Sequence, residues 1–249
     1  MGVKPENDAY GQENLAHLLG RESFEVVERD DGFVGLSGGP RTYFSKYRAW
    51  PLIEKKAIKF AKGRILDVGC GAGRVSLFLQ QKGFDATGID NSPTAVEVSK
   101  RRGLKKAMAL PIEDIGTFKP DSFDTIIMFG NNFGLFGSHQ KAKRLLKRMH
   151  NITSKDAVIL AESLDPYNTK DPVHLAYHKL NRERGRMGGQ LRIRIRFRNF
   201  VGSWFDYLLV SRSELKEVLR GTGWRVKKFM GSRRPLYIAV IEKETLPRP

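Results

Sequence analysis

The residues best suited to bind a reactive ligand form a glycine-rich segment at positions 65–73, with the sequence ILDVGCGAG. An apolar run that enters a glycine turn lets a ligand lie against backbone amides at the start of the next helix. The segment is not the dinucleotide fingerprint G-x-G-x-x-G, because Arg74 stands where the third glycine belongs. Asp67, at the end of the apolar run, would repel a pyrophosphate and attract a cationic ligand. A tight turn without a ligand is the alternative interpretation.

This segment resembles motif I of class I S-adenosylmethionine-dependent methyltransferases, and the resemblance continues in matching order over residues 64–165. S-adenosylmethionine carries an ammonium and a sulfonium but no phosphate, which suits an acid at Asp67. In the family, an acid placed like Asp90 binds both ribose hydroxyls, and residues 110–114 (LPIED) resemble the segment whose acid accepts from the adenine amino group. The cofactor-binding residues that the resemblance implies are Asp67, Gly69, Cys70, Gly71, Gly73, Asp90, Asn91, Glu113, Asp114 and Asn131.

The loop after the fourth strand of this pattern offers candidate catalytic residues, Asn131, Asn132 and Phe133. It loosely resembles the Asp/Asn-Pro-Pro-Tyr/Phe motif of enzymes that methylate exocyclic base amines, although it lacks the prolines. Amide carbonyls could accept protons of an aryl amine, and Phe133 could stack on its ring. The alternative is that these Asn and Gly residues only satisfy turn geometry.

A second candidate follows the next strand, where Asp165 and Tyr167 could act as a base or as orienting groups. His174 and His178 lie four residues apart on an expected helix, but no third ligand accompanies them. We therefore expect these histidines to make helix-surface or substrate contacts rather than to bind a metal, and we expect no metal site. Cys70, the single cysteine, lies inside the cofactor loop, which argues against a cysteine nucleophile of the cytosine C5 type.

An arginine stripe alternates with apolar residues in the segment 191–198 (LRIRIRFR). Period-two alternation places Arg192, Arg194, Arg196 and Arg198 on one face of a strand. Four like charges repel unless a polyanion or acids on a neighbouring strand face them, and Asp206 is the one acid in the expected facing run. The stripe is therefore predicted to bind RNA, with a solvated, charged edge strand as the alternative.

The elements that position these residues alternate between strand and helix from position 64 to 162. Such alternation predicts an α/β fold with a doubly wound, mostly parallel seven-stranded sheet covered by helices on both faces. We expect an N-terminal cover segment at 1–40 and a methyltransferase domain at 41–249. An insertion at about 163–210 is expected to contain a β-hairpin. Ser211 and Glu214 fit a capping box for a late helix.

Composition points to a polyanionic partner, because the net charge is +17 and the pI is about 10.1. One cysteine rules out an internal disulfide, and no apolar run approaches the length of a membrane span. The N-terminal residues do not form a signal-peptide pattern, so a cytoplasmic protein without membrane contact is expected.

Three functions follow from these patterns. The first is an S-adenosylmethionine-dependent RNA methyltransferase that acts on ribosomal RNA, at an exocyclic amine such as cytosine N4, by direct in-line transfer. The second is a small-molecule methyltransferase in which the 163–210 insertion forms a lid. The third is a cofactor-bound RNA-binding or assembly factor. The oligomeric state does not follow from the sequence.

Overall fold

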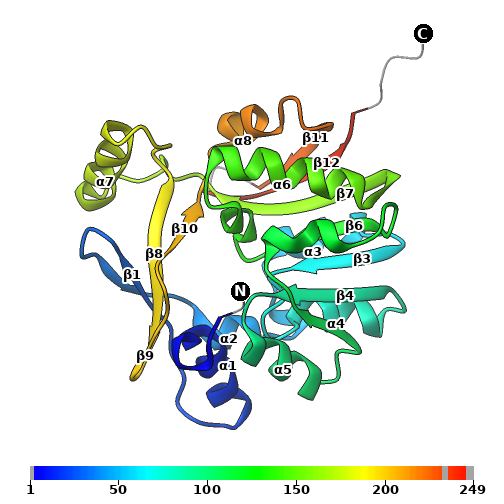
Figure 1. The fold of residues 1–249 in the computed structure, drawn as a ribbon, viewed down its shortest axis with the longest axis horizontal. Coiled ribbons are helices and arrows are strands. Elements are labelled where there is room, and N and C mark those ends of the chain that lie inside the picture. Colours follow the sequence, from blue (N-terminus) through cyan, green and yellow to red (C-terminus); the bar gives the residue numbers. More distant parts are fainter. Residues whose placement is uncertain (1–2, 232–234, 245–249) are drawn as a thin grey trace.

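The computed structural model describes residues 3–231 and 235–244. Its main sheet has seven strands in the spatial order β11-β12-β7-β6-β3-β4-β5 (Figure 1). Their bounds are Arg64–Val68 (β3), Asp85–Asp90 (β4), Lys106–Ala109 (β5), Phe123–Met128 (β6), Thr153–Leu164 (β7), Trp224–Met230 (β11) and Leu236–Lys243 (β12).

Strand directions in this sheet follow the predicted doubly wound pattern. The five strands from β5 to β7 are parallel to one another, with Asp67 opposite Gly88 of β4 and opposite Ile127 of β6. Strand β12 then inserts antiparallel beside β7, and β11 pairs antiparallel with β12 at the edge. The α/β class with a mostly parallel seven-stranded sheet is therefore confirmed.

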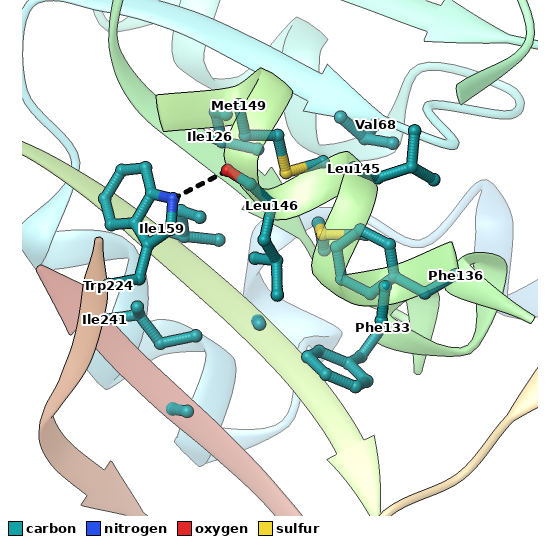
Figure 2. Close-up of a cluster of buried hydrophobic side chains, with 14 of the residues drawn as sticks. Val68, Ile126, Phe133, Phe136, Leu145, Leu146, Met149, Ile159, Trp224 and Ile241 are labelled. Atoms are coloured by element: carbon teal, nitrogen blue, oxygen red, sulfur yellow. Dashed lines mark hydrogen bonds between the residues drawn. The ribbon is translucent and has the colours of Figure 1, made fainter. Parts of the chain in front are cut away.

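Helices cover both faces of the main sheet because its strands are apolar on both sides. Ile65 and Ile127 pack on one face in a cluster with helices α3 and α4, whereas Leu66 and Ile126 pack on the other with α6 and α8. The second cluster includes Trp224 and the aromatic pair Phe133 and Phe136 (Figure 2). The helices are Ala9–Leu18 (α1), Gly39–Tyr43 (α2), Leu52–Ala57 (α3), Arg74–Gln81 (α4), Pro93–Arg101 (α5), His139–Asn151 (α6), Pro172–Glu183 (α7) and Arg212–Leu219 (α8).

Local sequence signals fix where several helices begin. The Ser92 hydroxyl accepts a hydrogen bond from the Ala95 amide, and Pro93 occupies the first turn of α5. Ser211 and Glu214 form the predicted capping box at the start of α8. These caps satisfy backbone amides that have no partner inside the helix.

A second, antiparallel sheet stands beside the main sheet (Figure 1). Its path is β10-β8-β1-β2, and β9 extends β8 as a short hairpin partner. The predicted pairing of the two insertion strands, β8 and β10, is present, but the N-terminal strand β1 lies on the other side of β8. The N-terminal segment and the insertion therefore build one layer together. Its strands are Val26–Arg29 (β1), Val34–Leu36 (β2), Gln190–Phe197 (β8), Phe200–Val201 (β9) and Phe205–Leu208 (β10).

None of the helices within the described ranges combines the length and the apolar character needed to cross a bilayer.

Candidate active site

A cavity of about 840 Å³ lies between the two sheets. Residues at the carboxyl ends of β3, β4 and β6 form one side of its wall, among them Val68, Asp90 and Phe129. Alternate residues of β8 form the opposite side: Leu191, Ile193 and Ile195. Ligands of doubly wound folds bind outside the carboxyl ends of the strands, so this cavity is the candidate active site.

The glycine loop closes the carboxyl end of β3 with three left-handed residues. Gly69, Gly71 and Gly73 have φ angles of 71°, 52° and 81°. Residues other than glycine rarely adopt this region of backbone conformation. A Cβ at Gly69 would lie 2.5 Å from the Asn132 amide nitrogen, and one at Gly71 would lie 2.3 Å from the Tyr10 hydroxyl. The loop therefore needs glycine for both its conformation and its close contacts.

Asp90 organises the cofactor half of the cavity. One carboxylate oxygen accepts from the Gly71 amide at 2.8 Å, and the other accepts from the Ser92 amide at 3.0 Å. A carboxylate oxygen has a second lone pair, so Asp90 remains able to accept from a vicinal diol. Asp67 instead accepts from the amide and hydroxyl of Ser76, which ties the end of β3 to the first turn of α4.

The residues present therefore fit S-adenosylmethionine as the resemblance implied. Asp67, Gly69, Cys70, Asp90, Asn91, Glu113 and Asn131 line the cavity. Gly71 and Gly73 shape the loop behind this wall, and Asp114 is not part of the wall. Glu113 also forms an ion pair with Lys141 of α6, which fixes the carboxylate at the rim.

Cofactor affinity is expected to depend on pH because burial raises the pKa of both Asp67 and Asp90 to about 6. A raised carboxyl pKa favours the protonated form in the folded protein, so each ionised carboxylate costs stability as pH rises from about 4 to about 6. The ionised form accepts at both carboxylate oxygens and attracts a cation, whereas protonation turns one oxygen into a donor and removes the charge. Affinity for S-adenosylhomocysteine should therefore fall below pH 6 by up to about ten-fold per pH unit for each of the two carboxylates that must ionise. Calorimetric titrations at pH 5 and pH 7.5 test this, and equal dissociation constants would contradict it.

Asn131 presents a free acceptor at the carboxyl end of β6. Its φ angle is 63°, and its side-chain Oδ1 is buried without a hydrogen-bond partner among the described residues. Two contacts hold this strained backbone: the Asn131 amide donates to Glu162, and the Asn131 carbonyl accepts from the Tyr207 hydroxyl at 2.7 Å. Glu162 is 3% exposed, and burial followed by the charge of Glu54 raises its pKa. Glu162 and Tyr207 therefore fix the Asn131 backbone and, through it, the position of the side-chain amide oxygen.

The other half of the cavity is apolar and aromatic. Besides the aliphatic residues of β8, it is lined by Trp204, Phe205 and Tyr207 from the β10 side. Helices α1 and α2 add Tyr10 and Tyr43, whose rings meet edge to face with centroids 5.4 Å apart. No motif in the sequence marked these residues, because they come from segments far apart in the chain.

Several predicted site residues lie elsewhere. Phe133 is fully buried in the core, with its ring 4.9 Å from Phe136, so the expected stacking of Phe133 on a substrate ring is wrong. Its neighbour Asn132 does line the cavity, and its amide nitrogen donates to the carbonyls of Val68 and Gly69. Asp165 and Tyr167 are outside the wall, and the Tyr167 hydroxyl donates to Glu214.

The two histidines of α7 are also outside the cavity wall. His174 contacts the guanidinium of Arg29 at 3.0 Å, and the His178 ring packs against that of Tyr167. Within the described part of the chain, no cluster of three metal-ligating side chains is present. These histidines connect α7 to its neighbours, and their substrate contact stays a prediction.

The arginine stripe is on the side of β8 that faces away from the cavity, and three acids form ion pairs with its four arginines. Arg194 and Arg196 both pair with Glu28 of β1, at 2.8 and 3.0 Å, and Arg192 pairs with Asp206 at 3.3 Å. Arg198 lies in the turn after β8, 4.0 Å from Glu22. Glu28 was missed because β1 lies more than 150 residues before β8 in the chain. Strand β8 is also flanked on both sides, so the edge-strand alternative is wrong.

Comparisons with known proteins agree with this geometry. A family model described as a methyltransferase domain matches residues 65–156. A solved S-adenosylmethionine-dependent methyltransferase from Bacteroides fragilis, in complex with S-adenosylhomocysteine, superposes with a TM-score of 0.84 at 26% identity and covers 98% of each chain. The fold, the glycine loop and this match define a class I methyltransferase. The chain is similar to the S-adenosylmethionine-dependent members of that class.

Curated relatives match over shorter segments. A ubiquinone biosynthesis O-methyltransferase from Xanthomonas euvesicatoria is 34% identical over 74 residues, which cover 28% of this chain and 31% of that protein. A 23S rRNA (uracil(747)-C(5))-methyltransferase from Pyrococcus horikoshii is 43% identical over 85 residues, or 34% of this chain and 20% of that protein. The chain therefore spans about a third or less of the length of these relatives, which differ in acceptor.

Proposed function

We propose that this protein is an enzyme that transfers a methyl group from S-adenosylmethionine to a small acceptor molecule. The observation that carries the proposal is the cavity of about 840 Å³, which runs from the glycine loop to the apolar side of the second sheet. Its size is in the range of pockets that enclose small ligands. The second sheet covers the acceptor end, which favours a compact molecule over a folded RNA.

The chain's own residues have separable roles in this proposal. In this proposal the glycine loop and Asp90 hold the ribose end of the cofactor, and Glu113, which lines the cavity, accepts from the adenine amino group. Bound S-adenosylmethionine supplies a methyl group activated by its sulfonium. The apolar wall excludes water from the acceptor, and Asn131 Oδ1 accepts a hydrogen bond that orients it.

RNA methylation is the second candidate, and the net charge of +17 favours it. Arg196 and Arg198 keep 44% and 48% of their side chains exposed despite their ion pairs, so both could still contact phosphates. In this candidate the target stays a ribosomal RNA base with an exocyclic amine such as cytosine N4. A cytoplasmic location is part of both candidates.

One labelling experiment separates the two candidates. We expect the protein and methyl-tritiated S-adenosylmethionine to label a low-molecular-mass metabolite fraction of cell extract and to leave total RNA unlabelled. Changing Arg192, Arg194, Arg196 and Arg198 to Gln should leave that labelling unchanged, because none of the four lines the cavity. Label in RNA would overturn the small-molecule proposal. If the stripe binds the RNA substrate, the four-fold Gln variant should bind RNA with a weaker salt dependence. The slope of log RNA affinity against log salt concentration should shrink by about 0.7–0.9 per lost phosphate contact.

A further inference from the structure

The cavity wall is acidic although the protein as a whole is basic. Six carboxylate residues line it among the described residues, against three basic ones: Asp8, Glu25, Asp67, Asp90, Glu113 and Asp206, with Lys4, Arg74 and Lys141. Ion pairs remove members of both sets: Arg74 pairs with Glu54, Lys141 with Glu113, and Asp206 with Arg192. Four acids remain, Asp8, Glu25, Asp67 and Asp90, against Lys4. The interior therefore attracts cations more strongly than the cofactor's acids alone explain.

Glu25 is one of the cavity acids that has no role in the cofactor half. It immediately precedes β1 in the second sheet and is 4% exposed. The hydroxyls of Ser37 and Tyr43 donate to its carboxylate, and both residues line the cavity with it. No lysine or arginine within the described ranges forms an ion pair with Glu25. A buried carboxylate with hydroxyl donors but no counter-charge is costly unless a cation reaches it.

A second buried acid lies behind Glu25 and responds to its charge. Glu13 of α1 is 0% exposed, and neither of its oxygens receives a hydrogen bond from a described residue. Burial, then the charge of Glu25 and a hydrogen bond between the two carboxyl groups, raises the pKa of Glu13 to about 11. Glu13 is therefore protonated at neutral pH, and Glu25 is the member of this pair that lines the cavity.

Tyr10 separates this pair from the cofactor loop. The Tyr10 hydroxyl lies against Gly71. The Tyr10 ring packs edge to face against the ring of Tyr43, whose hydroxyl donates to Glu25. On the acceptor side, Val27 and Ile195 are register partners in β1 and β8, and both line the cavity together with Ile193. Glu25 thus belongs to an apolar compartment at the acceptor end.

We propose that Glu25 binds the protonated amine of a small acceptor substrate whose apolar body packs against Val27, Ile193 and Ile195. The amine is an anchoring group, and the methylated atom lies elsewhere in the molecule, toward Asn131. This inference rests on the proposed small-molecule function and names the chemical class of its substrate: an amphipathic, primary or secondary amine.

The test uses matched probes that share one apolar body and differ in charge. Phenethylamine, tryptamine and hexylamine are each compared with the corresponding neutral amide and carboxylate, by calorimetry on the full-length protein saturated with S-adenosylhomocysteine. We expect at least one amine to bind about ten-fold or more tightly than its amide and carboxylate, because only the amine pairs with a buried charge. Glu25→Gln should abolish that preference, since glutamine still accepts from Ser37 and Tyr43 but carries no charge.

Glu28→Gln is the matched control. It removes the same charge three residues further along, from an acid that pairs with Arg194 and Arg196 and does not line the cavity, so the amine preference should persist. An absence of amine preference in the unmodified protein, or an equal preference in Glu25→Gln, would overturn the inference. Binding of S-adenosylhomocysteine reports separately on the proposed function. If the unmodified protein does not bind it, the methyltransferase proposal itself fails, whereas binding without amine preference removes only the role of Glu25.

Discussion

Replacing Asp90 by alanine is expected to weaken S-adenosylhomocysteine binding by more than about 100-fold. Each hydrogen bond from a ribose hydroxyl to a carboxylate contributes about 1.5–3 kcal/mol, and two such bonds are lost. The same substitution removes the acceptor of the Gly71 and Ser92 amides, so the glycine loop and the start of α5 also lose their anchor. Calorimetric titration with S-adenosylhomocysteine measures the effect.

Asp85→Ala supplies the control for this experiment. Asp85 begins the strand that Asp90 ends, but its side chain is 53% exposed and pairs with Lys106 at the surface, far from the cavity wall. Exposed pairs of this kind contribute little, so cofactor affinity should stay within about two-fold of the unmodified protein. Near-normal affinity in Asp90→Ala, or an equal loss in Asp85→Ala, would show that Asp90 does not hold the ribose.

The parts of the fold that the sequence could predict are those whose signals are local. Apolar runs separated by helix-length segments predict β3 to β7, and the Ser92, Pro93 and Ser211 signals fix the starts of α5 and α8. The second sheet could not be assembled in this way. Strand β1 pairs with β8 although Glu28 and Arg194 are 166 positions apart, and no local pattern names a partner at that distance.

The candidate site divides along the same line. Its cofactor half consists of β3, the glycine loop and the acid at the end of β4, which follow one another closely in the chain. Gly69 and Asp90 could therefore be identified from the sequence alone. Its acceptor half combines Tyr10, Glu25 and Tyr207 from three separate segments, and nothing near each residue marks it. Phe133 shows the remaining difficulty. One position along a short helix decides whether an aromatic ring enters the core or the cavity, and loop composition does not determine that choice.

Removing the Trp224 side chain is the substitution expected to destabilise the fold most. Trp224 is 1% exposed, and its indole nitrogen donates to the Leu146 carbonyl of α6 at 2.9 Å (Figure 2). It packs in the cluster that joins the β11–β12 edge to α6, next to Ile241. Trp224→Ala should lower the free energy of unfolding by about 3–5 kcal/mol, because a large cavity replaces the ring. For a chain of this size, each kcal/mol corresponds to roughly 2–4 °C in melting temperature.

Trp224→Phe separates the hydrogen bond from the packing. Phenylalanine keeps much of the ring volume but cannot donate to Leu146, so a cost of about 1–2 kcal/mol is expected. Thermal unfolding of the three proteins provides the comparison, and equal losses in both variants would contradict the cavity argument. Trp224 does not line the active-site cavity. Below its melting temperature, Trp224→Ala should therefore bind S-adenosylhomocysteine as the unmodified protein does, which distinguishes a stability role from a role in the site.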